Sequence, residues 1–168
     1  LDLHSTYDSG SSEINGKAIR IVKNDGNAVA SGDILGSIAF AGAEDTGSSI
    51  QTGARIDAIS EGTWGYTSNP ASLAFLTTSG NASQSEKMRI ASSGAIGVGA
   101  NNPDDYSTSG NNIVVKEAGN AGISIITGTS NTGNLYFGDG TGTDTYRGVV
   151  RYSHSDDSMQ FWTAGAER

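Results

Sequence analysis

The sequence contains no cysteine, only two prolines, and ten basic residues against eighteen acidic ones. Without cysteine the chain can form neither a disulfide nor a cysteine-ligated zinc or iron–sulfur site. The net charge of −8 argues against a nucleic-acid partner, because proteins that bind phosphate backbones normally present a basic face. No apolar run approaches the roughly 18 residues that a membrane-spanning helix requires. We therefore expect neither a nucleic-acid partner nor a membrane span.

Large apolar side chains are also scarce. Leu, Ile, Val and Phe together account for 31 residues, about 18% of the chain. This lies just under the roughly 20% below which a charged chain is suspected of disorder. The chain is therefore either disordered or buries its apolar residues against copies of itself. The regular spacing of Ile, Phe, Tyr and Trp between turn signals favours the second interpretation.

The apolar residues that are present fall in short clusters of alternating character, which is typical of half-buried strands. Between them lie clusters such as NDGN and DGTGTD, whose residues favour turns. No window shows the 3.6-residue stripe of an amphipathic helix. The predicted fold is all-β and elongated, with short antiparallel strands in repeated modules that intertwine or stack with copies of the chain. The predicted strand segments are Ala18–Lys23, Gly36–Gly42, Ala54–Ser60, Ser72–Thr78, Asn112–Lys116, Ile123–Thr127, Leu135–Gly138, Gly148–Ser153 and Ser158–Thr163.

Segments of the first half resemble segments of the second half in the same order, which indicates a stacked β architecture. This predicts a first module over residues 1–99, a linker and connecting strand over 100–120, and a shorter second module over 121–168. The second copy stops at Glu167-Arg168, and the chain begins with Leu1 rather than Met, so we expect a piece of a longer protein. The paired segments are Leu1–Thr6 with Ile123–Gly128, Gly36–Gly42 with Gly133–Asp139, Gly53–Ser60 with Gly148–Ser155, and Ser72–Gly80 with Ser158–Gly165.

Motifs that could carry catalysis or metal binding are weak. Adjacent carboxylates such as Asp104-Asp105 and Asp156-Asp157 point to opposite faces of a strand and lie in turn clusters, unlike the facing pair of a glycosidase. The segment Gly138–Thr145, with Asp139 and Asp144, lacks the ligand spacing of a calcium loop. No phosphate-binding loop is present, and the two histidines are isolated. We expect no catalytic residue, metal site or cofactor.

Two aromatic residues, Trp64 and Tyr66, lie in an insertion that the second module lacks, among Gly, Ser and Asn. Aromatic side chains with polar neighbours suit stacking on a sugar ring or anchoring a protein partner. The same side chains could instead fold back over a thin core, and the scarcity of large residues favours that interpretation. Trp64 and Tyr66 remain the candidate contacts with a glycan or a protein partner.

The string SEKMRIASSGAIGVGANNP, residues Ser85–Pro103, resembles a signature found repeatedly in bacteriophage tail fibre proteins. The segments Gly32–Asp45 and Tyr152–Arg168 resemble the strands that precede this signature in the same proteins. The resemblance implies a β-rich, elongated homotrimer on the virion. Many such proteins also carry a C-terminal self-cleaving chaperone domain, and no segment of this sequence matches it. The resemblance therefore implies a shaft or repeat region.

Within that string, five residues form what we name the clasp: Glu86, Lys87, Met88, Arg89 and Ile90. We expect the charges of the clasp to close one module, paired across chains, with Met88 and Ile90 turned inward. Ile96 and Val98 then face the axis of the assembly, while glycines on the other side allow close backbone approach.

The function expected from these observations is that of a non-enzymatic, structural and adhesive segment of a phage tail fibre. It would act as a trimeric spacer that contributes to attachment to a host-surface polysaccharide or protein. Two alternatives stay open at this point. One is a polysaccharide-depolymerising enzyme of the tailspike kind, for which the chain is short, and the other is a secreted bacterial adhesin repeat.

Overall fold

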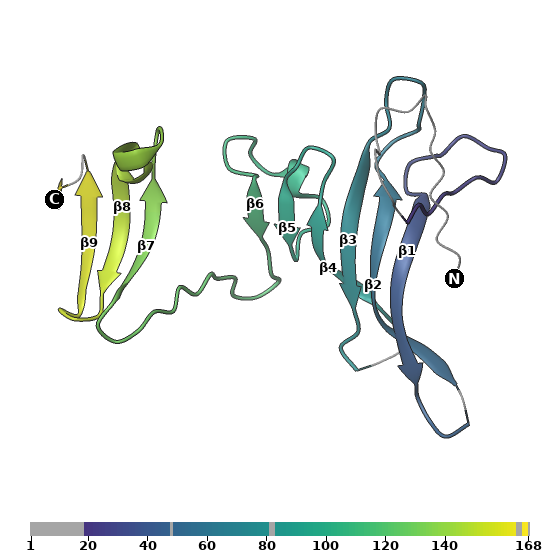
Figure 1. The fold of residues 1–168 in the computed structure, drawn as a ribbon, viewed down its shortest axis with the longest axis horizontal. Helices are drawn as coiled ribbons and strands as arrows, with labels where there is room; N and C mark the ends of the chain where they lie inside the picture. Colours follow the sequence, from purple (N-terminus) through teal and green to yellow (C-terminus); the bar gives the residue numbers. More distant parts are fainter. Residues whose placement is uncertain (1–18, 48, 81–82, 164–165, 168) are drawn as a thin grey trace. The chain divides into compact units, whose positions relative to one another are not determined.

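The computed structural model describes residues 19–47, 49–80, 83–163 and 166–167, and it divides the chain into two units at Ala121 and Gly122. Each unit is built around one open β-sheet (Figure 1). Among the described residues no α-helix occurs, and two short 3-10 turns are the only helical elements. The all-β prediction is thus confirmed.

The first unit contains a six-stranded sheet in the order β1-β2-β3-β4-β5-β6, so that each strand lies beside its neighbour in sequence. All neighbouring pairs are antiparallel except β5 and β6, which are parallel. The connection between these two includes the 3-10 turn η1, Pro103–Asp105. The strands are β1 Ile34–Ala43, β2 Ile50–Ser60, β3 Ala71–Thr77, β4 Ser85–Ile90, β5 Ile96–Val98 and β6 Ile113–Val115.

The second unit contains a four-stranded antiparallel sheet in the order β10-β9-β8-β7. A 3-10 turn, η2 (Gly142–Tyr146), stands between β7 and β8. The strands are β7 Thr132–Phe137, β8 Gly148–Ser153, β9 Ser158–Thr163 and β10 Ala166–Glu167.

Two predicted strands are wrong. Residues 19–23 and Ile123–Thr127 belong to no sheet, although both alternate apolar and polar residues. An alternating pattern marks a chain with one apolar side, but a strand also needs a neighbouring backbone that accepts its hydrogen bonds. Ile21 lies beside Gly36 of β1 through its side chain, without joining the sheet.

The buried residues are small or polar. Alanines, Pro103 and Val149 are the buried apolar side chains, and Asp57, Ser60, Ser72 and Ser153 are the buried polar ones. Among the described residues no Ile, Leu, Phe or Met is buried. The large apolar side chains therefore remain half-buried or exposed on the faces of the sheets.

Several sequence expectations lie outside the described residues. They concern the repeat segment Leu1–Thr6, residue Ala18 of the first predicted strand, and Arg168 at the expected start of a second clasp.

Candidate functional site

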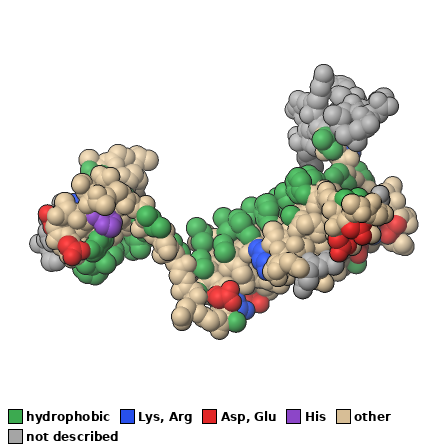
Figure 2. Space-filling model, turned by 90° about the horizontal axis from the view of Figure 1, so that it is seen from below, with side chains coloured by type: hydrophobic (Ala, Val, Ile, Leu, Met, Phe, Trp, Pro, Cys, Tyr) green, Lys and Arg blue, Asp and Glu red, His purple; other side chains and the backbone are tan. Residues whose placement is uncertain are grey.

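One face of the six-stranded sheet is apolar across its whole width. Residues paired across neighbouring strands point to the same face, and alternate residues along each strand share it. Figure 2 shows hydrophobic side chains gathered along one side of the larger unit. We call this surface the apolar face. Its first row is Ile38, Ile56, Phe75, Met88, Val98 and Val115. Its second row is Gly36, Ala58, Leu73, Ile90, Ile96 and Ile113.

The apolar face is largely open to solvent. Five of its large side chains are exposed, namely Ile38, Phe40, Leu73, Val98 and Ile113. Single exposed apolar residues are ordinary, but a contiguous apolar surface marks an interaction site. A hollow of about 140 Å³ lies on this face between Ile21, Ile38 and Leu73.

The opposite face is polar and carries the most buried charge of the first unit. The Asp57 carboxylate, 1% exposed, accepts a hydrogen bond from Ser37 Oγ at 2.7 Å and one from Arg55 Nε at 2.8 Å. Arg55 and Asp57 are two residues apart on β2, so the strand itself places them side by side on this face. An unpaired buried carboxylate would be costly, and the hydrogen bonds from Ser37 and Arg55 offset that cost for Asp57.

The clasp is centred on Arg89. Its guanidinium forms two hydrogen bonds with the Glu86 carboxylate, at 2.8 and 2.7 Å, and donates a third to Ser72 Oγ at 2.9 Å. A second carboxylate, that of Glu61, lies 3.7 Å away. The hydrogen bonds from Arg89 to Glu86 raise the pKa of Arg89, so this cation stays protonated. Glu86 and Arg89 thus pair within one chain.

Glu61 connects the clasp to a neighbouring turn. Its carboxylate accepts a hydrogen bond from the backbone N–H of Ser92 at 2.9 Å. Burial by itself raises the pKa of Glu61, but the hydrogen bonds from Ser92 and Ser72 and the charge of Arg89 outweigh it and lower that pKa. Glu61, Arg89 and Ser92 are part of the lining of a polar groove of about 490 Å³.

The other clasp residues lie on β4 at positions set by the register. Met88 pairs with Phe75 and Ile90 with Leu73, so both belong to the apolar face, while Lys87 is exposed. Gly97 of β5 is paired with Arg89 on the polar face, where a Cβ would overlap the carbonyl oxygen of Ala100. The absence of a side chain at Gly97 lets the following turn fold back onto the sheet.

The pairings of the four-stranded sheet match those of β1–β4 at several positions. Its apolar row Leu135–Val150–Phe161 corresponds to Ile38–Ile56–Phe75, and Leu135 and Phe161 are exposed. The pair Trp162 and Glu167 corresponds to Leu76 and Glu86. In this register Ala54 corresponds to Gly148, since their partners are Phe40 and Phe137. The sequence alignment of the two halves pairs Gly53 with Gly148, so it differs from the structural register by one residue.

Trp64 and Tyr66 lie in different environments. Trp64 is half-buried, and its indole Nε1–H donates to the Pro70 carbonyl at 3.1 Å while its backbone N–H donates to Val29 at 2.9 Å. Tyr66 is fully exposed between Gly65 and Ser68, which form an isolated bridge. Trp64 therefore holds the loop, and Tyr66 presents its ring to solvent.

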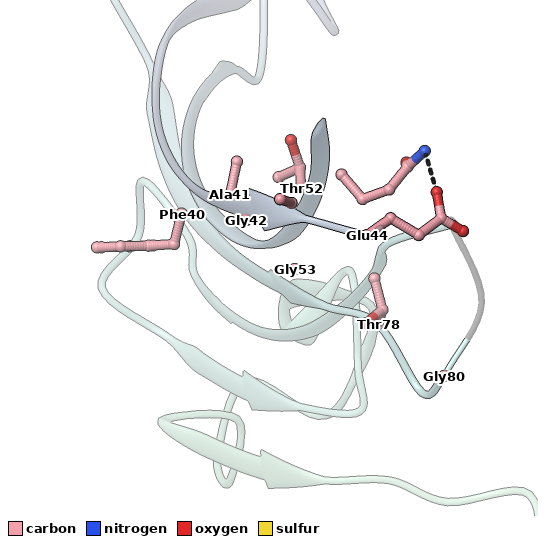
Figure 3. A pocket seen from close by; sticks show the side chains of 10 residues that line it. Phe40, Ala41, Gly42, Glu44, Thr52, Gly53, Thr78 and Gly80 are labelled. Atoms are coloured by element: carbon pink, nitrogen blue, oxygen red, sulfur yellow. Dashed lines mark hydrogen bonds between the residues drawn. The ribbon is translucent and has the colours of Figure 1, made fainter. Parts of the chain in front are cut away.

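A cavity of about 500 Å³ lies where the β1–β2 hairpin extends beyond β3 (Figure 3). Glu44 accepts a hydrogen bond from Gln51 Nε2 at 3.1 Å across the hairpin. Most of the remaining lining consists of glycine, alanine and threonine, such as Gly42 and Thr52. Figure 3 shows the Phe40 side chain pointing away from those of Ala41 and Thr52. The lining offers backbone and small side chains, with a single carboxylate.

The weak chemical motifs lie in turns. Asp104 accepts hydrogen bonds from Ser93 and Asn111, and Asp139 and Asp144 both face Arg147. In the part of the chain that the structure describes, no three His, Cys, Asp or Glu residues are placed to share a metal ion. Nor does any helix among the described residues have the length and hydropathy needed to cross a membrane.

No protein-family model matches the chain, and no curated protein sequence matches it significantly. Solved structures do match. The carboxy-terminal domain of the bacteriophage T5 L-shaped tail fibre aligns with a TM-score of 0.58 at 9% identity, covering 98% of this chain and 86% of that one. The chain shares its fold with this tail fibre domain. The same domain with its intramolecular chaperone aligns with a TM-score of 0.54 at 10% identity, covering 94% of this chain and 55% of that one.

The resemblance to phage tail fibres that the sequence suggested is therefore confirmed at the level of the fold. Sequence reasoning missed the buried Asp57 network and the role of Glu61. The alternation of Arg55 and Asp57 within one predicted strand was a signal for the first, because it places opposite charges on one face. Nothing local marks Glu61, whose partners Arg89 and Ser92 lie 28 and 31 residues further along the chain.

Proposed function

We propose that this chain is a non-enzymatic structural segment of a phage tail fibre on the virion, in which copies of the chain associate through their apolar faces as a homotrimer. The observation that carries this proposal is the inverted burial of both sheets. Small and polar residues are buried within the chain, while rows of Ile, Leu, Phe and Val are left open. The shared fold with a tail fibre domain supports it.

Association through the apolar face accounts for the composition. Each copy buries few large side chains alone, and three copies around one axis can each contribute a row such as Ile38–Ile56–Phe75 to a common core. Apolar burial is the dominant favourable term in such association. Val98 and Ile96 lie on the same face, so in this assembly they point toward the axis, as expected from the sequence of residues 85–103.

We also propose that the two sheets are copies of one module, over residues 1–99 and 121–168, joined by residues 100–120. The matched register of β1–β4 and β7–β10 supports this, since the apolar rows and the glutamates Glu86 and Glu167 fall at equivalent pairings. Stacked modules of this kind bury a continuous core against neighbours.

The experiment is a measurement of the solution mass. Light scattering on the purified chain should give three times its 17.2 kDa. A well-folded monomer at micromolar concentration would contradict the proposal, whereas a dimer would contradict the three-fold arrangement alone.

Within this function we assign contact with a host-surface glycan or protein to Tyr66, with Trp64 holding its loop. An exposed aromatic ring at a loop tip can stack on a sugar ring, and three copies would add avidity to a weak site. Tyr66→Ala should reduce binding of the oligomer to host cells and leave its thermal stability unchanged. Unchanged binding by Tyr66→Ala would overturn this assignment without touching the assembly proposal.

A further inference from the structure

The face of the four-stranded sheet opposite the row Leu135–Val150–Phe161 carries a small recess of about 180 Å³. Register places Asn134 opposite Arg151, and Tyr136, Val149 and Trp162 form the adjacent row on the same face. The turn η2 adds Tyr146, whose ring meets that of Tyr136 edge to face at 6.4 Å between centroids. The recess is lined by Asn134, Tyr136, Tyr146, Val149, Arg151 and Trp162.

Two of the lining side chains hold buried donors that lack an acceptor. Arg151 Nε and Trp162 Nε1 are both buried, and within the described part of the chain neither has a hydrogen-bond partner. The Arg151 guanidinium lies 5.1 Å from the centroid of the Trp162 ring, which brings the two donors into one corner of the recess. Buried donors in native proteins are normally satisfied. Gln160 Oε1, opposite Arg151 in the register, is a buried acceptor that also lacks a partner, and the recess leaves the two donors open to a further acceptor that enters it.

The cationic group of the recess is Arg151. None of the ion pairs between the side chains that the structure describes involves Arg151. The acidic residues on and near η2, Asp139 and Asp144, both face Arg147, at 4.0 and 3.5 Å. Arg151 therefore supplies positive charge to the recess in a chain of net charge −8.

We propose that this recess binds a carboxylate carried on a ring of monosaccharide size, as in a uronic acid. The carboxylate oxygens accept hydrogen bonds from Arg151 Nε and Trp162 Nε1, since a guanidinium matches a carboxylate in both charge and geometry. The ring packs against the aromatic side chains of Tyr136 and Tyr146, whose hydroxyls face polar substituents. The volume is below the roughly 300 Å³ at which pockets for drug-sized ligands begin, so one ring is the unit recognised.

The site is separate from the apolar face and from Tyr66, so it stands or fails independently of the proposed assembly. Leu135 and Phe161 of the apolar row lie on the opposite face of this sheet. Loss of oligomerisation would therefore leave the recess intact, and occupation of the recess would not block association.

Calorimetric titration of the full chain with galacturonate, galactose and cyclohexanecarboxylate tests the proposal. Galacturonate should bind, and galactose, which lacks the carboxylate, should bind at least tenfold more weakly. Cyclohexanecarboxylate tests whether the recess recognises sugar acids or any carboxylic acid on a six-membered ring. Binding equal to that of galacturonate assigns the site to carboxylic acids on rings in general, and weaker binding assigns it to sugar acids. No binding of either acid overturns the proposal.

Variants locate the binding. Arg151→Gln should weaken galacturonate binding at least tenfold, whereas Arg147→Gln, which removes the same charge beside the recess, should change it less than twofold. Trp162→Phe keeps the ring and removes the donor, so it tests the site if Arg151→Gln does not fold, and it should weaken binding several-fold. Equal effects of Arg147→Gln and Arg151→Gln would mean that overall charge attracts the acid, and the recess would be excluded.

Discussion

Glu86 and Arg89 are three residues apart on β4, yet they form a two-fold hydrogen-bonded ion pair on one face of the sheet. In a regular strand, residues three apart point to opposite faces. The pairing of β3 with β4 shifts between Phe75 and Leu76, which leaves Lys87 without a partner as a β-bulge. The bulge thus brings the two charges together, and the ion pair in turn fixes the register that sends Met88 to the apolar face.

Removing the cation of this pair should destabilise the fold strongly. The side chains of Arg89 and Glu86 are only 15% and 12% exposed, and Arg89→Gln leaves the carboxylates of Glu86 and Glu61 without their counter-ion. We expect a loss of about 3 kcal/mol in the free energy of unfolding, as for other buried pairs broken from one side. Urea denaturation followed by circular dichroism measures it.

The matched control is Arg147→Gln, whose ion pairs with Asp139 and Asp144 are exposed. Exposed pairs contribute less than about 1 kcal/mol, so this variant should unfold almost as the native chain does. Equal losses in the two variants would show that the bulge, and not the ion pair, holds β4 in place.

Stability should fall in acid through Glu61. Its pKa is lower in the folded chain than the ordinary value of 4.5, because hydrogen bonds from Ser92 and Ser72 and the charge of Arg89 outweigh its burial. A lowered folded pKa means that ionised Glu61 stabilises the fold above its unfolded pKa. This stabilisation is lost as the pH falls through the folded pKa. Unfolding measured from pH 7 to pH 2 should therefore show a decline that begins near pH 5.

Glu61→Gln should flatten that decline, since the variant has no proton to take up at this position. Asp25→Asn is the control, because the pKa of Asp25 is also lowered, chiefly by a hydrogen bond from Lys23, but this carboxylate is exposed. If the decline in acid is unchanged in Glu61→Gln and flattened in Asp25→Asn, the acid sensitivity of the fold comes from Asp25 and not from Glu61.

Gly97→Ala should be among the most damaging small substitutions in the chain. A Cβ at Gly97 would overlap the backbone carbonyl of Ala100, so the turn after β5 would have to move away from the sheet. We expect a loss of about 2 kcal/mol or more, as for overpacking in general. Gly110→Ala, where a Cβ meets nothing within 4 Å, should change stability little. Thermal unfolding of the two variants decides between them.

The faces of the strands were predictable from the sequence, but their neighbours were not. Alternation within Ser72–Thr78 correctly places Leu73 and Phe75 on one side, because side-chain direction follows from the strand itself. The equally alternating Ile123–Thr127 is not a strand, because no neighbouring backbone pairs with it. The parallel pairing of β5 with β6 likewise depends on how the loop through Pro103 returns.

Several residues of the candidate site were likewise predictable from the sequence, whereas their contacts were not. The signature string pointed to Glu86 and Arg89, but their pairing within one chain depends on the bulge at Lys87, which no local pattern marks. Trp64 and Tyr66 look alike in sequence, and they differ only because the loop closes so that Trp64 reaches the Pro70 carbonyl. Composition and periodicity do not predict contacts that span a turn or a register shift.

Two adjacent residues of β1 test the apolar face directly. Ile38 is 53% exposed on the apolar face, and Ala39 is exposed on the opposite face beside Arg55. Because both are open in the single chain, glutamate at either position should leave the sheet folded. Ile38→Glu places a charge in the surface that copies are proposed to bury, where an unpaired carboxylate is costly. Light scattering should show Ile38→Glu shifted toward the 17.2 kDa monomer, and Ala39→Glu unchanged. If Ile38→Glu keeps the mass of the native chain and Ala39→Glu lowers it, the copies associate through the polar face, and the inverted burial of the sheets needs another explanation.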